Sequence, residues 1–425
     1  MWAWGLLGLG SAALLLTLNA FWSLRRPVWL LPISFFASWL TLELVVFHLM
    51  FHLATAGLMI WNGALSEVQG VVGLCLVAAA CVGLLKLWRT SIKAADVMRE
   101  EIGEGEVGGF PLVNVLVPFW FKRSGVKVTK NVEYGRAGGQ VLRLDVYESG
   151  KREVGKRPAL LQIHGGGWVV GDKREQGLPL VHHMASQGWV CFNVNYRLSP
   201  WATFPDHLVD IKRARAWIRG HADEYGIDPD FVAVTGGSAG GHLASLMGLT
   251  WDDERYKPGF EAEDVSVQAV ASIYGVYDFC DRLGLMRGEF VSHLLERWVM
   301  KAFLKESPEM FSEASPLDRV REDAPPFLVV HGDRDTLSPV EYAELFAERL
   351  RKASCARVYL TVIPGAQHAF DVFLSPRTAR VLTGVELFLK RCWGDHINAR
   401  ESKGTEQGVD EEGIGAGNIE EGALN

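Results

Sequence analysis

Charged residues are distributed very unevenly along the 425-residue chain, and this pattern constrains the fold more than any other feature. The first 95 residues contain five basic and two acidic residues, whereas the whole chain contains 43 basic and 50 acidic residues. Apolar stretches of about 20 residues are long enough to cross a bilayer as helices. The sequence therefore predicts a membrane region at residues 1–95, followed by a region of ordinary soluble composition.

The membrane region contains three apolar runs, at 2–22, 28–61 and 68–88. A cleaved signal peptide is the alternative for the first run, but such peptides begin with basic residues, and no Lys or Arg precedes Arg25. The second run is longer than one span requires, so it predicts either one long tilted helix or a bent re-entrant pair. We expect about three membrane spans.

Basic residues flank the apolar runs on one side of the expected membrane. The loop at 62–67 contains no Lys or Arg. Basic residues instead lie between the first two runs or close to the end of the third: Arg25, Arg26, Lys86, Arg89 and Lys93. Because loops rich in Lys and Arg stay in the cytoplasm, we expect a multi-pass membrane protein whose remaining chain lies on the cytoplasmic side.

The second run also contains three ionisable residues, Glu43, His48 and His52, on neighbouring parts of one helical face. Ionisable groups inside a membrane region are either functional or form hydrogen bonds with a neighbouring helix. We favour hydrogen bonds within the helical bundle for all three.

Beyond the membrane region, we divide the chain into a linker at 96–109, a folded domain at 110–395 and a tail at 396–425. The linker is charged and rich in Gly. From residue 399 the tail has no aromatic residue and carries seven acidic against two basic residues, so we expect it to be disordered. The whole chain has a net charge of −7, and no basic surface argues for a nucleic-acid partner.

The folded domain alternates short β-branched or apolar runs with helical patterns. The turn at Gly138 and Gly139 joins the first two runs as a hairpin, and the later runs are typical of strands buried on both faces. This alternation predicts an α/β fold, a mostly parallel sheet with helices on both faces. The expected strands are 126–134, 141–147, 159–163, 190–194, 231–235, 267–273, 327–330 and 358–363, and the expected helices are 206–224, 239–249, 339–352 and 376–391.

A glycine-rich turn around Ser238 follows one expected strand and opens an expected helix. Its sequence, TGGSAGG at 235–241, contains G-x-S-x-G in the strand–turn–helix context that this motif needs. Gly236 and Gly240 leave room for a sharp, strained turn that exposes the Ser238 hydroxyl. The N-terminus of the following helix directs free amides toward a developing anion. Such turns also bind phosphate, but the motifs that accompany this one favour a nucleophilic serine.

A second glycine-rich loop, HGGGW at 164–168, follows the strand expected at 159–163. Its glycines let the backbone turn amides inward, as an oxyanion hole requires. We expect the oxyanion donors to be the amides of Gly165, Gly166 and Ala239. In this interpretation His164 braces the loop and transfers no proton.

The remaining members of a catalytic triad are expected after the serine, in the order acid and then histidine. Asp335 lies in the loop after the strand expected at 327–330, within HGDRDTL, and His368 follows the next strand, within PGAQHAF. We expect Ser238, Asp335 and His368 to be catalytic, with Asp333 as the alternative acid. Other histidines are expected to pack, to face solvent or to support the site: His182, His183, His207 and His242.

These motifs, together with NYRLSP at 195–200, resemble the α/β-hydrolase superfamily. They are most similar to its hormone-sensitive-lipase-type esterases and carboxylesterases, which include membrane-anchored bacterial lipase and esterase relatives. The resemblance covers about residues 126–393 and implies an eight-stranded, largely parallel sheet and a Ser238–His368–Asp335 triad. Two features depart from the family pattern: the acid motif is not of the DPL type, and the membrane region is not part of the shared domain and inherits no function.

We therefore expect a membrane-anchored serine hydrolase that cleaves small-molecule or lipid carboxylic esters through an acyl-enzyme, with no metal or organic cofactor. The same triad would also serve an amidase, a formamidase or a peptidase. An acyltransferase and a non-catalytic scaffold on the same fold are the remaining alternatives.

The segment at 275–326 is long enough to form a cap over the site. It contains a helical apolar stripe made of Phe290, Leu294, Leu295, Trp298, Val299, Ala302 and Phe303. Core packing is the favoured interpretation of this stripe, and a lid or acyl pocket is the alternative. Beside a membrane, the stripe favours esters with apolar acyl groups.

Overall fold

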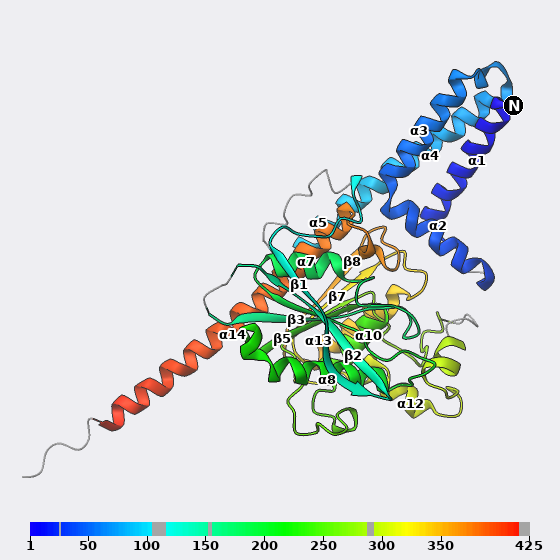
Figure 1. Cartoon of the computed structure of the whole chain (residues 1–425). Helices are drawn as coiled ribbons and strands as arrows, with labels where there is room; N and C mark the ends of the chain where they lie inside the picture. Colours follow the sequence, from blue (N-terminus) through cyan, green and yellow to red (C-terminus); the bar gives the residue numbers. More distant parts are fainter. Residues whose placement is uncertain (25–26, 104–115, 152–154, 287–292, 416–425) are drawn as a thin grey trace, which may run out of the picture.

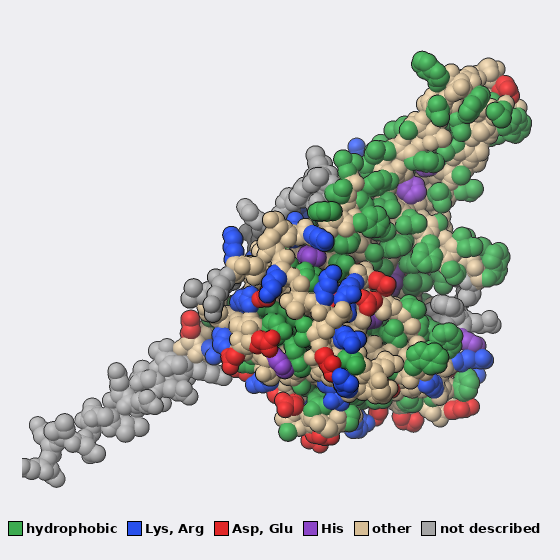
Figure 2. Space-filling view, viewed as in Figure 1, with side chains coloured by type: hydrophobic (Ala, Val, Ile, Leu, Met, Phe, Trp, Pro, Cys, Tyr) green, Lys and Arg blue, Asp and Glu red, His purple; other side chains and the backbone are tan. Residues whose placement is uncertain are grey.

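The computed structural model describes residues 1–24, 27–103, 116–151, 155–286 and 293–415, and at Val28 and 403–415 it describes the backbone only. A helical bundle formed by the N-terminal region projects from one side of an α/β domain (Figure 1). Hydrophobic side chains cover the bundle, whereas charged side chains gather on the domain (Figure 2). The structure thus separates the two regions that differ in charge along the sequence.

Three helices of the bundle lie side by side: α1 (Trp2–Phe21), α3 (Val45–Trp61) and α4 (Val68–Ile92). Glycines set the closest approach between α1 and α4. A Cβ at Gly73 would lie 2.5 Å from the backbone of Leu6 and Leu7, and one at Gly10 would lie 2.4 Å from the Gly73 carbonyl oxygen. Contacts between small residues are typical of helices that associate in lipid.

The second apolar run forms two helices and not one. After η1 (Val28–Leu30), α2 (Leu31–Glu43) ends at Leu44, and α3 continues at an angle of 89° to it. By length and composition, Trp2–Phe21 and Val68–Ile102 are able to cross a membrane, and the bent pair of α2 and α3 is a third candidate. A short turn, η2 (Ala64–Ser66), connects α3 with α4.

The first part of the expected linker is a helix, α5 (Ala94–Ile102). Ala94, Met98 and Ile102 recur at four-residue spacing and are buried against the domain. Glu101 Oε1 accepts a 3.0 Å hydrogen bond from the Leu360 amide and so ties α5 to the sheet. The linker expectation therefore missed an amphipathic helix, and 104–109 lie outside the described residues.

The domain contains an eight-stranded sheet with the order β1-β2-β4-β3-β5-β6-β7-β8. β1 and β2 are antiparallel to their neighbours, and the pairs from β4 to β8 are parallel. This arrangement confirms the predicted fold class. The strands are β1 (Val126–Ala137), β2 (Gln140–Ser149), β3 (Arg157–Ile163), β4 (Val190–Val194), β5 (Ile227–Gly237), β6 (Ala269–Ile273), β7 (Phe327–Gly332) and β8 (Val358–Ile363).

Helices cover both faces of the sheet. Successive residues of each strand point to opposite sides, so both faces carry apolar side chains that must be buried. In β5, Val232 and Val234 belong to the core on one face, whereas Phe231 and Ala233 belong to the core on the other. The first core is covered by α8 (Asp206–Gly220), α10 (Ala239–Leu249) and α13 (Val340–Ala353). The second is covered by α5, α7 (Leu178–Ser186) and α14 (Pro376–Gly415).

Shorter helical segments complete the domain. They are α9 (Ala222–Tyr225), η3 (Glu254–Tyr256), η4 (Leu295–Val299), α12 (Pro308–Glu313), η5 (Pro316–Asp318) and η6 (Phe370–Val372). The sequence did not predict α7, whose nine residues are too few to show a clear helical period.

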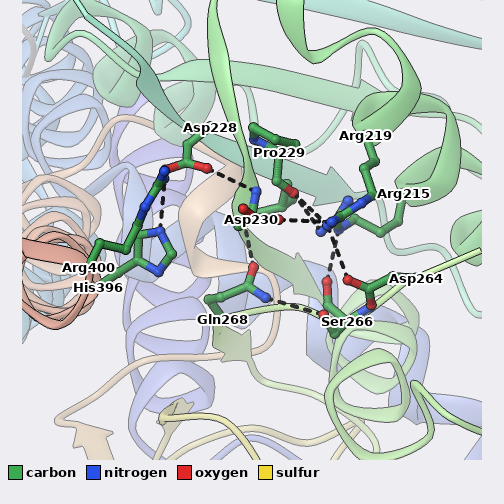
Figure 3. A network of polar contacts seen from close by, with 11 residues as sticks. Arg215, Arg219, Asp228, Pro229, Asp230, Asp264, Ser266, Gln268, His396 and Arg400 are labelled. Carbon is green, nitrogen blue, oxygen red and sulfur yellow. Dashed lines mark hydrogen bonds and ion pairs between the residues drawn. The ribbon is translucent and has the colours of Figure 1, made fainter. Parts of the chain in front are cut away.

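The last helix differs from the tail expected at 396–425. α14 continues without a break to Gly415, and 416–425 lie outside the described residues. Asp228 at the start of β5 accepts hydrogen bonds from His396, at 3.3 Å, and from Arg400 (Figure 3). A helix held this far by the domain extends with one hydrogen bond per added residue and no new nucleation cost.

The same polar network joins β5 to α8 at the amino ends of the parallel strands. Arg219 donates a 2.8 Å hydrogen bond to Asp230, and Arg215 donates one of 2.9 Å to the Ser266 carbonyl (Figure 3). This network therefore stabilises the amino ends of the strands, at the opposite end of the sheet from the carboxyl ends.

Candidate active site

Ser238 occupies the sharp turn between β5 and α10. Its backbone has φ 58° and ψ −121°, a strained conformation for a residue with a side chain. A Cβ at Gly240 would lie 2.1 Å from the Ile163 carbonyl oxygen, so only glycine allows this turn to pack on β3. The Ser238 amide donates a 3.0 Å hydrogen bond to the Ile273 carbonyl, which fixes the turn on β6.

The structure brings together the three residues predicted to form a triad. His368, in the loop after β8, places Nε2 2.8 Å from Ser238 Oγ. Its Nδ1 lies 2.6 Å from Asp335 Oδ2, in the loop after β7. The serine, the imidazole and the carboxylate therefore form one hydrogen-bonded chain at the carboxyl edge of the sheet.

Asp335 is fully buried and its carboxylate is well satisfied. Oδ1 accepts hydrogen bonds from the amides of Leu337, at 2.9 Å, and Ser338, at 2.7 Å. Burial by itself raises the pKa of Asp335, but the charge on a protonated His368 and hydrogen bonds from His331 and His368 lower the pKa below its usual value. The carboxylate therefore stays ionised beside the imidazole.

Asp333, the alternative acid, takes no part in this chain. Its Oδ1 accepts a 2.7 Å hydrogen bond from the Gly365 amide, and burial raises its pKa. The geometry thus agrees with the expected acid, Asp335, and not with the alternative, Asp333.

Two residues that sequence reasoning did not single out support the triad. Gln367 Oε1 accepts hydrogen bonds from the amides of Thr336, at 2.8 Å, and His368, at 3.0 Å, and so joins the acid loop to the histidine loop. The ring of Tyr274 packs against His368 with centroids 4.8 Å apart. Gln367 lies in the PGAQHAF motif, but only its spatial neighbours reveal what it connects.

The glycine loop at 164–168 lies beside Ser238, with one correction to the expected oxyanion donors. The Gly165 amide donates a 2.7 Å hydrogen bond to Gln176 Oε1, so it is already occupied. Gly166 adopts φ 104°, which favours glycine, and Ala239 is the first residue of α10, where an N–H has no helical acceptor. Of the three expected donors, Gly166 and Ala239 remain as candidates.

The other histidines have structural contacts. The Nε2 of His242 lies 2.7 Å from the Ala314 carbonyl oxygen, and His207 Nε2 lies 3.1 Å from Ser199 Oγ. His182 packs edge-on against Tyr147, and His183 contacts Glu386 at 2.6 Å. Burial lowers the pKa of His242 and of His207 to about 3, so both side chains are neutral near pH 7.

The segment proposed as a cap contributes mainly to the core. Leu295 and Val299 are buried in the first core, whereas Trp298 and Phe303 are exposed. A Cβ at Gly167 would lie 3.3 Å from Leu294 Cδ2, which places this segment next to the glycine loop. Phe290 lies outside the described residues.

Within the described part of the chain, no group of three or more His, Cys, Asp or Glu side chains is arranged to hold a metal ion.

The bundle contacts the loops that carry the candidate triad. Arg334, next to Asp335, donates a 2.7 Å hydrogen bond to the Ala20 carbonyl at the end of α1. Glu43 of α2 pairs with Arg377 and accepts a 2.6 Å hydrogen bond from Ser375, so it binds the domain and not another bundle helix as we expected. The charged partner lies 334 residues away in the sequence, where no local pattern could indicate it.

Comparison with known proteins agrees with this geometry. Residues 144–350 match the family model described as BD-FAE. The domain has the α/β-hydrolase fold, which it shares with solved esterases. An esterase of Thermogutta terrifontis, solved after phosphonylation by sarin, is 27% identical to this α/β-hydrolase, with a TM-score of 0.53 over 62% of this chain and 92% of that chain.

Two relatives from Mycobacterium tuberculosis are more similar in sequence. "Probable carboxylic ester hydrolase LipM" is 45% identical over 277 residues, which are 65% of this α/β-hydrolase and 62% of the relative. "Esterase LipQ" is 40% identical over 274 residues, which are 64% of each protein. The match thus spans less than two thirds of the length of either relative.

Proposed function

We propose that this α/β-hydrolase is a membrane-anchored serine hydrolase that cleaves carboxylic esters through an acyl-enzyme. The observation that carries the proposal is the hydrogen-bonded chain from Ser238 Oγ through His368 to Asp335, with contacts of 2.8 and 2.6 Å. The names of the mycobacterial relatives, a carboxylic ester hydrolase and an esterase, support the same reaction class.

In the proposed reaction, His368 Nε2 takes the proton from Ser238 as the serine oxygen attacks the ester carbonyl. Asp335 holds the imidazole in the correct orientation and stabilises its protonated form. The negative oxygen of the tetrahedral intermediate accepts hydrogen bonds from the Gly166 and Ala239 amides, and each such donor is worth about 3 kcal/mol of barrier.

The intermediate then collapses, and His368 returns the proton to the leaving alcohol oxygen. Water attacks the acyl-enzyme with His368 again as the base, which releases the carboxylic acid and restores Ser238. These steps need only the side chains and amides named here.

Membrane anchoring is supported by the composition and length of the bundle helices. We propose that α1, α3 and α4 cross the bilayer, with the catalytic domain on the cytoplasmic side as the basic residues favour. Because the bundle contacts the loops next to the triad, esters with apolar acyl groups have a short path from lipid to Ser238.

Labelling with a fluorophosphonate tests the proposed reaction. The full chain should be labelled and its Ser238→Ala variant should not, as the phosphonylated Thermogutta relative suggests for this fold. Labelling that survives the substitution would overturn the assignment of Ser238, and no labelling of either form would favour a non-catalytic scaffold.

Hydrolysis of matched p-nitrophenyl esters and anilides separates an esterase from an amidase, and product analysis with an alcohol acceptor detects acyl transfer.

The preferred length of the substrate's acyl group is tested with p-nitrophenyl esters of short and long carboxylic acids. We expect the full chain in detergent or vesicles to prefer the longer apolar acyl groups. A strong preference for short chains would overturn this part of the proposal.

A further inference from the structure

The helix α2 has the opposite polarity to a surface helix of a soluble protein. Its large apolar side chains Ile33, Phe36 and Leu40 are 65%, 54% and 38% exposed. Its polar side chains are buried, among them Ser34 and Ser38. A water-facing helix shows the reverse pattern, so the exposed face of α2 fits an apolar medium.

The buried polar face of α2 is held by the end of α1. Ser34 Oγ donates a 2.6 Å hydrogen bond to Asn19 Oδ1, and the Leu24 amide donates one of 2.7 Å to Ser34 Oγ. Ser23 Oγ donates a 2.7 Å hydrogen bond to Ser38 Oγ. These bonds orient α2 so that its apolar face points away from the protein.

The carboxyl end of α2 is held by the catalytic domain. Trp39 Nε1 donates a 2.9 Å hydrogen bond to the Ala369 carbonyl, and its ring lies 4.8 Å from that of Phe373. Glu43 is buried against Arg377 and Ser375. All of these partners lie in or just after the loop that carries His368.

The angle of 89° between α2 and α3 decides how α2 meets a bilayer. If α3 crosses the membrane, α2 runs along the membrane plane, as its crosswise position in Figure 1 shows. The 13 residues of α2 span about 20 Å at 1.5 Å per residue, which is shorter than the roughly 30 Å hydrocarbon core. α3 likewise exposes large apolar side chains, for example Phe51. Hydrophobic side chains predominate over the whole bundle in Figure 2.

We propose that α2 is an interfacial helix that lies in the lipid surface beside the bundle. Ile33, Phe36 and Leu40 enter the outer part of the acyl-chain layer, and the opposite face holds the His368 loop. The carboxyl edge of the sheet, with Ser238, is thereby kept at the membrane surface, where esters embedded in the bilayer are within reach. The inference rests on the proposed membrane anchoring and specifies the lipid surface as the occupant of this face.

Photocrosslinking tests the lipid contact directly. Benzoylphenylalanine replaces Phe36 in the full chain, which is reconstituted in vesicles of phosphatidylcholine and phosphatidylglycerol, and adducts are identified by mass spectrometry. A second variant carries the probe at Ile33. The water-facing control carries it at Glu224, an exposed residue just before the amino end of β5, and the bundle control carries it at Phe51.

We expect lipid adducts at 33, 36 and 51 and only background at 224. Adducts at 51 but not at 33 or 36 would overturn the interfacial helix while leaving membrane anchoring intact. No adduct at any position would overturn the anchoring itself and this inference with it. Crosslinks from 33 and 36 to a second copy of the chain, in place of lipid, would also overturn the inference. Fluorophosphonate labelling of each variant reports separately on the proposed reaction and shows that the domain is folded.

Discussion

The indole Nε1 of Trp39 donates a 2.9 Å hydrogen bond to the carbonyl oxygen of Ala369, the residue that follows His368. A side chain of the N-terminal region thus fixes the backbone next to the proposed catalytic base, 330 residues further along the chain. Trp39 is a positioning residue in this arrangement, because it acts on His368 only through the loop.

Removing this hydrogen bond should lower kcat and leave KM nearly unchanged. Trp39→Phe keeps a ring against Phe373, so the expected loss is about fivefold, which corresponds to ~1 kcal/mol for one hydrogen bond. The matched control is Trp29→Phe, since Trp29 is exposed and lies just before α2. Steady-state kinetics with one p-nitrophenyl ester give both constants. An unchanged kcat for Trp39→Phe would show that the loop is fixed without this bond.

Breaking the buried pair of Glu43 and Arg377 should strongly destabilise the junction between the bundle and the domain. Glu43→Ala leaves the Arg377 guanidinium buried without its anionic partner, and such a loss costs about 3–5 kcal/mol. The thermal unfolding midpoint of the full chain in detergent measures the effect. Glu67→Ala, at an exposed position before α4, is the control and should leave the midpoint unchanged. Equal midpoints for the two variants would contradict the prediction.

The two carboxylates of the acid loop should differ sharply in their effect on rate. Asp335→Asn keeps the shape of the side chain but removes the charge that orients His368, and a loss of about 10⁴-fold in kcat is expected by analogy with serine proteases. Asp333→Asn changes a carboxylate that accepts from the Gly365 amide and should have a much smaller effect. Measured kcat values for both variants decide between the two acids; the reverse order would restore Asp333 as the acid.

Gln176 should matter for the rate although it belongs to no recognised motif. Its side chain accepts a hydrogen bond from the Gly165 amide and so holds the loop that presents Gly166. Gln176→Ala is expected to lower kcat by about tenfold, or ~1.4 kcal/mol, with little change in KM. Glu175→Ala, at the exposed neighbouring position, serves as the control. If kcat is unaffected, the loop holds its conformation without Gln176.

Acidification should destabilise the protein before the carboxylates are protonated. Burial lowers the pKa of His242 from 6.5 to about 3 and that of His164 to about 4. Below pH 6.5 the unfolded chain therefore binds protons that the folded chain does not, and stability falls as the pH decreases. Each such histidine contributes a slope of about 1.4 kcal/mol per pH unit in this window.

The unfolding midpoint should accordingly be lower at pH 5 than at pH 7. His242→Gln should reduce the difference between the two midpoints, because one titrating group is removed. A midpoint that rises on acidification, or a difference that the substitution leaves unchanged, would contradict this account.

Local patterns in the sequence predicted most of the fold. The strands of the sheet are short runs in which apolar residues either alternate with polar ones or follow one another without interruption. The turn at Ser238 has glycines where its backbone contacts β3. Such features depend on near neighbours along the chain, so they can be read without tertiary structure. The candidate triad followed from the same patterns, because each member lies at the carboxyl end of a recognisable strand.

Other features depend on contacts between distant segments, and the sequence did not predict them. The side chain of Gln176 occupies the Gly165 amide, and Glu43 of α2 pairs with Arg377 of the domain. The apolar stripe of α5 is too short to distinguish this helix from a linker, and α14 extends into a segment whose composition predicts disorder.

The sequence by itself determined two regions of opposite character, an apolar N-terminal bundle and a parallel α/β domain with a nucleophile turn. Only the tertiary structure decided that these regions meet beside the loops that carry the candidate triad. Helix α2 bends by 89° from α3, buries Glu43 against Arg377 and places Trp39 on the histidine loop. The hydrophobicity of the sequence predicts which segments are buried or enter a membrane. It does not predict which distant residue pairs with a buried charge or accepts a hydrogen bond from an indole.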